Sequence, residues 1–314
     1  MTDHRQLIEA RIAEWCAALP NDGLYPPMAY LMRLPAKRVR PALVLMGCEL
    51  FGGKAADALD EALGIELFHN FTLMHDDIMD AAPLRRGQPT VHAKWNVNTG
   101  ILSGDAMLVK SYQLMAKRSE VLDLFSRYAL GVCEGQQRDM EFESRDSVSV
   151  AEYMEMIRLK TAVLLSCALQ TGAIVAGANP ADRKLVGEFG EHLGLAFQLR
   201  DDLLDAFGDP AITGKQQGGD LRAGKKTFLL IRGAERAVQE RSTVLNEELA
   251  KPNDQRDVSR MRDVMEQLGV RSEAEAEVLK HDRAAQEALA AINVPEYLKA
   301  PLRALAAMLL DRAN

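Results

Sequence analysis

The sequence has few cysteines, and they form no recognisable motif. The four residues lie far apart, without a CxxC pair or a Cys/His pairing, at Cys16, Cys48, Cys133 and Cys167. The scattered cysteines therefore give no support to zinc ligation or to a disulfide framework. The scattered thiols indicate a reducing compartment, and we expect a cytoplasmic protein.

An excess of positive charge is also absent. Lys and Arg number 38 against 45 Asp and Glu, which gives a net charge of -7 and a pI near 5.5. No global positive field exists to hold a nucleic acid, so any anion must be bound locally. With 47% hydrophobic residues and only 12 Pro, the chain is long enough to bury a large core, and wholesale disorder is excluded.

Strongly apolar runs are equally scarce. Residues 161–181 carry no charge, but small side chains dominate the segment and Gln170 lies within it. This composition predicts a buried helix in a bundle rather than an integral membrane span. The first residues are charged and amphipathic, unlike a signal peptide.

Apolar residues recur at helical spacing along nearly the whole chain, and no sustained strand-like alternation occurs. The pattern predicts an all-α protein. Pro83 closes the helix that carries the clearest apolar stripe. The expected helices cover residues 3–19, 40–51, 55–80, 103–118, 121–143, 150–177, 181–207 and 226–249, with shorter helices over 254–314.

No Ser/Gly/Pro-rich linker or internal repeat divides the sequence, so we expect one domain over residues 1–314. The longest glycine-dotted segment, residues 208–224, lies between two strong helices. Long loops of this kind inside a compact domain are often functional lids.

A second stripe on the 55–80 helix is polar and acidic. His69, Thr72, Asp76 and Asp80 follow one another at spacings of 3, 4 and 4, and Asp77 adjoins them. Carboxylates within one helical turn repel each other unless a cation lies between them. One such motif alone is as often a solvated helix face.

The same pattern recurs 125 residues later (201 - 76 = 125), as Asp201, Asp202 and Asp205. On that helix Gly190 and Gly194 precede the carboxylates on the same face, which predicts empty volume beneath them. Two facing clusters of this kind favour Mg²⁺, which commonly bridges a few carboxylates and substrate phosphates. A di-iron bundle is not supported, since it uses two Glu-x-x-His pairs and the sequence has this spacing only at Glu66 and His69.

Basic residues gather in compact groups in this acidic protein. Arg85 and Arg86 begin five residues after Asp80, and Lys215 and Lys225 follow Asp205 within the glycine-dotted segment. Acidic and basic groups are thus paired twice, and the basic residues have the charge expected of phosphate ligands. The basic groups are Lys37, Arg38 and Arg40; Arg85 and Arg86; Lys160; Lys215; Lys225 and Lys226.

Together these motifs resemble the trans-isoprenyl diphosphate synthases, or polyprenyl synthetases, of the short-chain type. The resemblance covers residues 37–227 and includes Asp76-Asp77-x-x-Asp80, Phe197-Gln198-x-x-Asp201-Asp202-x-x-Asp205 and the Gly214–Thr227 motif. It implies a single-domain orthogonal helical bundle around a central cavity, the type I isoprenoid synthase fold. It also implies the head-to-tail condensation of isopentenyl diphosphate with dimethylallyl, geranyl or farnesyl diphosphate, in a homodimer.

The resemblance implies a role for each matching residue. Three Mg²⁺ ions would be bound principally by Asp76, Asp80 and Asp201, with support from Asp77, Asp202 and Asp205. The allylic diphosphate would contact Arg85, Lys160, Lys215 and Lys225, whereas isopentenyl diphosphate would contact Lys37, Arg38, His69 and Arg86. Thr161 and Gln198 would lie beside the forming bond.

Two features modify the resemblance. Pro35-Ala36 replaces the Gly-Gly that usually precedes the first basic pair, and Phe228-Leu229 replaces the usual Leu-Pro. The resemblance makes Phe71, five positions before Asp76, the floor of the product tunnel, with the small Thr72 beside it. These positions predict a twenty-carbon product, geranylgeranyl diphosphate, with farnesyl diphosphate next. Periodicity alone places Phe71 in the core.

Two other functions remain open at this point. A terpene cyclase also ionises an allylic diphosphate, but it needs no second diphosphate site. A non-catalytic partner subunit of a synthase is the other alternative, although such subunits are expected to lose the metal-binding aspartates.

Overall fold

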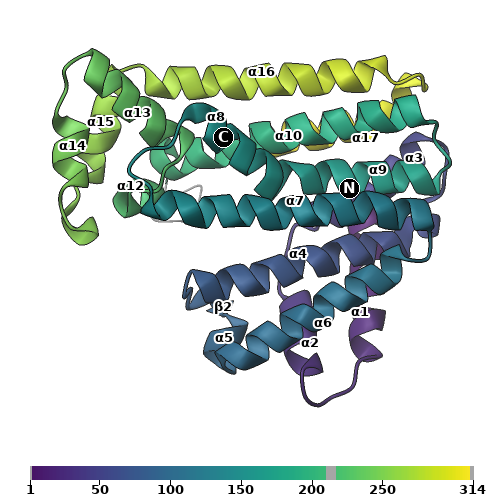
Figure 1. Ribbon diagram of the computed structural model, residues 1–314. Helices are drawn as coiled ribbons and strands as arrows, with labels where there is room; N and C mark the ends of the chain where they lie inside the picture. Colours follow the sequence, from purple (N-terminus) through teal and green to yellow (C-terminus); the bar gives the residue numbers. More distant parts are fainter. Residues whose placement is uncertain (1, 210–216, 312–314) are drawn as a thin grey trace. The chain divides into compact units, whose positions relative to one another are not determined.

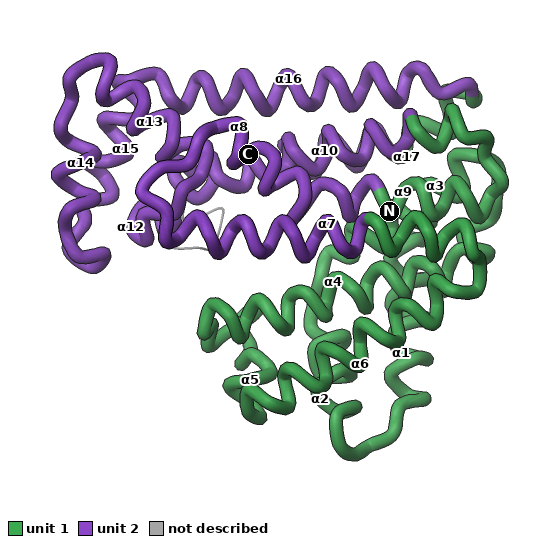
Figure 2. Tube along the Cα trace, viewed as in Figure 1, with its two compact units in different colours: residues 1–127, 167–184, 294–301 green, residues 128–166, 185–293, 302–314 purple. Residues whose placement is uncertain are grey.

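The computed structural model describes residues 2–209 and 217–311. Nearly all of the described part is helical (Figure 1). The chain forms two compact units, each built from three segments (Figure 2). Unit 1 contains residues 1–127, 167–184 and 294–301, and unit 2 contains residues 128–166, 185–293 and 302–314.

The elements of unit 1 are α1 (Thr2–Ala17), α2 (Tyr25–Arg33), α3 (Val39–Leu50), η1 (Ala55–Ala58), α4 (Leu59–Met79), β1 (Leu84–Arg85), β2 (Gln88–Pro89), α5 (Val91–Lys94) and α6 (Val97–Met115). Those of unit 2 are α8 (Val150–Ile157), the π-helical turn η2 (Arg158–Ala162), α12 (Gly219–Ala223), α13 (Phe228–Gln239), α14 (Val244–Leu249), η3 (Asn253–Gln255), α15 (Val258–Gln267) and α16 (Val270–Ala291). Both units contain parts of α7 (Ser119–Ser144), α9 (Val163–Val175), α10 (Pro180–Phe207) and α17 (Glu296–Leu310).

Small residues bring α4 and α6 close together in unit 1, where the two helices lie side by side (Figure 1). A Cβ atom on Gly64 would lie 2.7 Å from Met115 Cε, and one on Gly104 would lie 2.3 Å from His75 Nε2. The Ser111 hydroxyl donates a hydrogen bond to the Gly64 carbonyl at 2.7 Å. Helix α4, which carries the first aspartate motif, is thus held by close packing rather than by large side chains.

A short antiparallel hairpin follows α4 and was not expected from the sequence. Strands β1 and β2 pair Leu84 with Pro89 and Arg85 with Gln88. The two residues of the turn both have positive φ, 52° at Arg86 and 74° at Gly87. This is the pattern of a type I′ turn, which suits tight hairpins. The chain therefore reverses direction directly after Arg85.

In unit 2, η2 is packed closely by two neighbouring helices. A Cβ atom on Gly135 of α7 would lie 2.3 Å from Lys160 N, and one on Gly194 of α10 would lie 2.5 Å from Ala162 Cα. The expectation that Gly194 leaves empty volume beneath the carboxylates is therefore wrong. Backbone of the neighbouring segment fills that volume, because glycine permits the close approach.

Several helix boundaries differ from the expected ones. The 150–177 segment is interrupted by η2, and the 226–249 segment ends one helix near Arg241, where φ is 56°. Helix α2 was missed, although Pro26 and Pro27 at its first positions are a helix-start signal. Helix α16 has 22 residues, so the C-terminal segment is not made of short helices alone.

One helical segment, Val150–Val175, is long and apolar enough to cross a membrane by length and composition. However, 78% of its most apolar window is buried inside the protein. This is the burial of a core helix, in agreement with the small side chains of the segment.

Candidate active site

The first aspartate motif lies at the C-terminal end of α4. Asp77 is 2% exposed, and Arg85 holds it: Nε lies 2.9 and 2.8 Å from the two carboxylate oxygens, and Nη2 lies 2.8 Å from Oδ1. Asp76 is half-buried and Asp80 is exposed. The middle aspartate is thus neutralised by an arginine of the hairpin, and a bidentate pair of this kind also orients the guanidinium.

Arg38 does not occupy the place that the sequence predicted. It is 3% exposed, and its guanidinium donates to Glu9 at 3.0 Å, to Glu66 at 2.6 Å and to the carbonyls of Met32 and Leu34 at 2.5 and 3.3 Å. Its backbone is left-handed, with φ of 51°, a conformation that such anchoring can sustain. We correct its role from ligand of isopentenyl diphosphate to structural anchor of this loop.

Arg40, two residues later, lies beside another predicted ligand. Its Nη1 atom is 3.1 Å from Nε2 of His69, which is half-buried on α4. Burial lowers the pKa of His69 well below its usual value, and the charges of Arg40, Arg86, Arg85 and Arg38 lower it further. A neutral imidazole among arginines, in a protein of net negative charge, is a local environment suited to an anion.

Lys37 is exposed at the start of the same basic segment, and Arg86 is exposed in the hairpin turn. In unit 1, the charges of Arg40, Arg85 and Arg86 therefore all act on His69 and lower its pKa.

Phe71 and Thr72 follow His69 on α4. Phe71 is 8% exposed, and its ring makes an edge contact with His75 at 4.8 Å between centroids and a tilted one with Phe68 at 5.6 Å. The Thr72 hydroxyl donates to the carbonyl of His69 at 2.8 Å. Phe71 thus belongs to an aromatic cluster in the core of unit 1, and its role as tunnel floor stays a prediction.

The second aspartate motif, at the end of α10, contains another buried middle residue. Asp202 accepts hydrogen bonds from the Tyr153 hydroxyl and, at 3.2 Å, from Gln198 Nε2. Gln198 Oε1 in turn accepts from the Thr161 hydroxyl at 3.1 Å. Burial raises the pKa of Asp202 to about 7, although both donors favour its ionised form. The predicted neighbours Thr161 and Gln198 are therefore in direct contact, and the motif aspartate is one end of their network.

Asp205 holds the segment that follows α10. Its Oδ2 atom accepts from the Asp220 amide at 3.0 Å, and its carbonyl accepts from the Gly218 amide at 2.7 Å. These bonds anchor the first turn of α12. Asp201 is half-buried on α10, and Lys215 lies outside the described residues.

One carboxylate brings two predicted diphosphate ligands together. Asp139 of α7 lies 2.6 Å from Nζ of Lys160 and 3.6 Å from Nζ of Lys225. Burial opposes ionisation of Asp139, but the charges of Lys225 and Lys160 outweigh it and lower its pKa. Two lysines distant in sequence thus form one basic group in unit 2.

Sequence reasoning missed two residues of these networks, Asp139 and Tyr153, and it named Arg40 among the basic residues without assigning it to a substrate. Arg40 was visible in the basic segment, at the fourth position of Lys37-Arg38-Val39-Arg40. Asp139 and Tyr153 have no local signal, because their partners lie 21 to 86 residues away along the chain (160 - 139 = 21; 225 - 139 = 86).

A divalent cation bound by the protein alone would need several acidic, His or Cys side chains close together. Among residues 2–209 and 217–311, no three Asp, Glu, His or Cys side chains gather closely enough to bind a metal by themselves. The aspartates with the structural partners described above are Asp77, Asp202 and Asp205, which were expected to support the metal ligands. Mg²⁺ typically takes one or two carboxylates together with substrate phosphates and water, so the aspartates fit an ion that arrives with a diphosphate.

Comparison with known proteins decides the family. Residues 21–268 match the polyprenyl synthetase family. The chain belongs to this family. Short chain isoprenyl diphosphate synthase of Methanothermobacter thermautotrophicus is 34% identical over 99% of this chain and 97% of its own. Geranylgeranyl diphosphate synthase of Sulfolobus acidocaldarius is 42% identical over 68% of this chain and 67% of its own.

Solved structures agree with this membership. A crystal structure of geranylgeranyl pyrophosphate synthase superposes with a TM-score of 0.93 at 42% identity, covering 100% of this chain and 99% of the other. Polyprenyl synthase from Caulobacter crescentus CB15, complexed with calcium and isoprenyl diphosphate, gives 0.83 at 27% identity, covering 100% and 95%. This polyprenyl synthetase therefore has the all-α isoprenoid synthase fold and is a prenyltransferase of a family that catalyses with Mg²⁺.

Proposed function

We propose that the chain, as a single domain, makes geranylgeranyl diphosphate, and that both aspartate motifs and their basic residues take part in catalysis. The observation that carries the proposal is that each aspartate segment has cations built in beside it. Arg85 is fixed by Asp77 in unit 1, and Lys160 and Lys225 share Asp139 in unit 2. Both curated and solved relatives include geranylgeranyl diphosphate synthases.

In this proposal Arg85, Lys160 and Lys225 neutralise the allylic diphosphate as it leaves, and Lys215 joins them. Bound Mg²⁺, with Asp76, Asp80 and Asp201 as ligands and three ions per centre, would supply further charge neutralisation for the leaving group. Cleavage of the allylic C–O bond then gives a carbocation, and exclusion of water by the closed site protects it.

Isopentenyl diphosphate is held, in this proposal, by Lys37, Arg40, Arg86 and His69. We assign Arg40 rather than Arg38 to this set, because Arg40 touches His69 whereas the guanidinium of Arg38 is enclosed by two carboxylates and two carbonyls. The double bond attacks the cation, and loss of a proton leaves a chain five carbons longer. Thr161 and Gln198, linked to each other, orient the reacting atoms.

The decisive experiment is product analysis by mass spectrometry after incubation with Mg²⁺, isopentenyl diphosphate and primers of five, ten and fifteen carbons. Each primer should give the twenty-carbon diphosphate. Asp201→Asn should abolish turnover, whereas Asp254→Asn, an exposed change outside the motifs, should not. Cyclic product without isopentenyl diphosphate would indicate a terpene cyclase, and inactivity of the wild-type chain would indicate a non-catalytic subunit.

Product length depends, in this proposal, on Phe71. Phe71→Ala should extend the product beyond twenty carbons, because it removes the ring that floors the tunnel. Phe68→Ala is the matched control: it removes a neighbouring ring of the same cluster, 1% exposed, and tests whether loosening of the core alone lengthens the product. Unchanged product length in Phe71→Ala would reject the role.

We further propose a homodimer in the cytoplasm. Helix α6 exposes apolar side chains at helical spacing, with Val97, Ile101 and Val109 exposed by 47%, 40% and 56%, a pattern suited to an interface. Light scattering after size-exclusion chromatography should give twice the chain mass, and Ile101→Lys should reduce it to one.

A further inference from the structure

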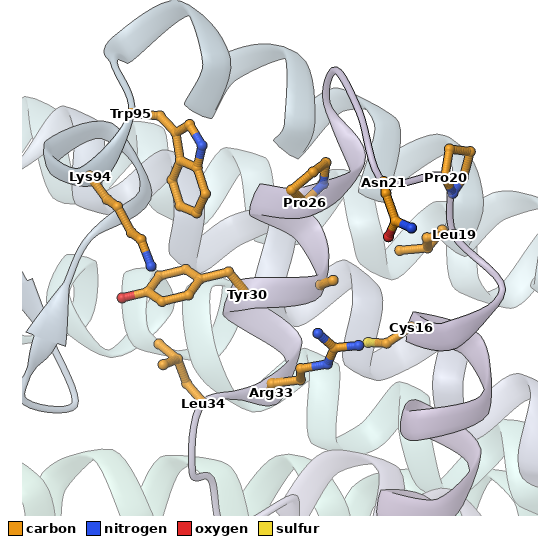
Figure 3. A pocket seen from close by; sticks show the side chains of 11 residues that line it. Cys16, Leu19, Pro20, Asn21, Pro26, Tyr30, Arg33, Leu34, Lys94 and Trp95 are labelled. Atoms are coloured by element: carbon orange, nitrogen blue, oxygen red, sulfur yellow. The ribbon is translucent and has the colours of Figure 1, made fainter.

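A cavity of about 380 Å³ lies in unit 1, away from the aspartate motif (Figure 3). Its walls come from the end of α1, from α2 with the loop before it, and from the end of α5. Nothing in the proposed reaction uses this cavity. Its volume falls within the range of small-molecule sites.

Two cations line the cavity without a carboxylate to balance them. Arg33 and Lys94 are both exposed, and no Asp or Glu is among the lining residues. Across the two described stretches of the chain, neither side chain takes part in an ion pair, whereas Arg11, Arg38 and Arg85 of the same unit do. Unbalanced cations at one cavity indicate an anionic ligand.

The same cavity offers an apolar, aromatic surface. The rings of Tyr30 and Trp95 meet edge to face at 5.3 Å, and Lys94 Nζ lies 3.9 Å from the Tyr30 centroid and 5.0 Å from that of Trp95. Leu34 closes the floor with 6% exposure. Figure 3 shows the Lys94 amine at the Tyr30 ring and the Arg33 guanidinium beside Cys16. An occupant would thus need an apolar body as well as an anionic head.

Hydrogen bonds connect residues that line the cavity to both basic segments of unit 1. The Tyr30 hydroxyl donates to the carbonyl of Pro89 at 2.8 Å, in the hairpin that carries Arg85 and Arg86. The carbonyl of Leu34 accepts from Arg38, the residue before α3. Occupation of the cavity would therefore stabilise the positions of two segments that the proposed reaction uses.

We propose that this cavity is a binding site for a small amphipathic anion, with one phosphate or carboxylate group between Arg33 and Lys94 and an apolar body against Tyr30 and Trp95. At about 30 Å³ per water-sized group, the volume accommodates a ligand of about a dozen non-hydrogen atoms. The site is separate from the catalytic residues, so it stands whether or not the proposed product is correct.

Trp95 provides a direct readout, because the chain has only two tryptophans. In the Trp15→Phe variant, Trp95 is the sole fluorophore of its kind. Binding draws Lys94 away from the ring and changes its emission. The titrations use dimethylallyl monophosphate and phenylacetate, with EDTA present so that metal-assisted binding at the aspartate motifs does not contribute. Inorganic phosphate and dimethylallyl alcohol are the matched head-only and body-only probes.

A saturable change with dimethylallyl monophosphate or phenylacetate supports the site, and the probe that responds identifies an isoprenoid phosphate or an aromatic carboxylate as the ligand source. Arg33→Gln and Lys94→Gln should each raise the dissociation constant about tenfold, whereas Arg5→Gln, an exposed cation elsewhere in unit 1, should not. Denaturant unfolding establishes that these variants fold. The proposal is overturned if neither probe gives saturation, if phosphate alone or the alcohol alone responds as strongly, or if binding survives loss of both cations.

Discussion

The two aspartate motifs have the same sequence pattern but different surroundings. In unit 1 the buried middle aspartate, Asp77, is paired with Arg85, whereas in unit 2 the equivalent Asp202 is bonded to the neutral groups of Tyr153 and Gln198. In unit 2, Lys160 and Lys225 are paired instead with Asp139, which belongs to neither motif. An identical spacing of carboxylates therefore does not imply an identical electrostatic role.

The difference has a physical consequence. Asp77 and Arg85 form an ion pair, and removal of either partner leaves an unbalanced charge in a poorly solvated place. Burial raises the pKa of Asp202 although its phenol and amide donors lower it, and an amide can replace this carboxyl group at small cost. The first motif should thus be sensitive to loss of charge, and the second to loss of hydrogen bonds.

The same substitution in both motifs tests this contrast. Asp77→Asn should lower the free energy of unfolding by about 3 kcal/mol, because it removes a buried ion pair and leaves Arg85 without its counter-charge. Asp202→Asn should lower it by less than about 1 kcal/mol, since the amide oxygen still accepts a hydrogen bond. Urea unfolding without metal measures both. Equal losses would contradict the contrast.

Tyr153→Phe addresses the hydrogen bonds of the second motif. The change keeps the ring, which is 2% exposed, and removes the hydroxyl that donates to Asp202. The free energy of unfolding should fall by about 2 kcal/mol, because a buried acceptor loses a donor. Tyr297→Phe, at a site 74% exposed, is the control and should change stability little. A neutral result for Tyr153→Phe would mean that Asp202 does not depend on this bond.

The helical character of the chain was predictable because it rests on local periodicity. The long helix from Leu59 to Met79 lies almost where the apolar stripe placed it. The hairpin after it was missed, since two-residue strands carry no periodicity and Arg86-Gly87 is a weak turn signal. The π-helical turn at Lys160 was also missed. It accompanies the close approach of Gly135 and Gly194, which are remote from it in sequence and leave no local signal.

For the candidate site, the sequence identified residue types better than their partners. Thr161 and Gln198 were expected together and are in contact. Arg38 was assigned to a substrate by resemblance to the family, but its side chain is turned inward to Glu66. Such orientation depends on the left-handed backbone at that residue, which no spacing rule predicts for an arginine.

Asp139→Asn tests whether the lysines of unit 2 need their shared carboxylate. With that charge gone, Lys160 and Lys225 should repel each other and separate, because each loses a charge-assisted contact. The KM for the allylic diphosphate should rise about tenfold, equivalent to about 1.4 kcal/mol, with a smaller effect on the KM for isopentenyl diphosphate. Glu141→Gln, an exposed change on the same helix, should leave both constants unchanged. An equal rise in both constants would argue for a general loss of structure.

The smallest expected effect is a loss of stability at low pH, caused by a histidine pair in unit 2. His281 of α16 faces His192 of α10, with 3.0 Å between their Nδ1 atoms, and Lys280 and Glu277 adjoin it on its own helix. Burial first, and then the charges of His192 and Lys280, lower the pKa of His281 to about 4. In the unfolded chain His281 binds a proton near pH 6.5, whereas in the folded chain it binds one only near pH 4. The free energy of unfolding therefore falls as the pH falls from 7 towards 4. Between pH 7.5 and pH 5 the free energy of unfolding should fall by at least about 1 kcal/mol more in the wild type than in His281→Asn, measured by urea unfolding at each pH. If both proteins respond equally to acid, this histidine pair does not limit unit 2.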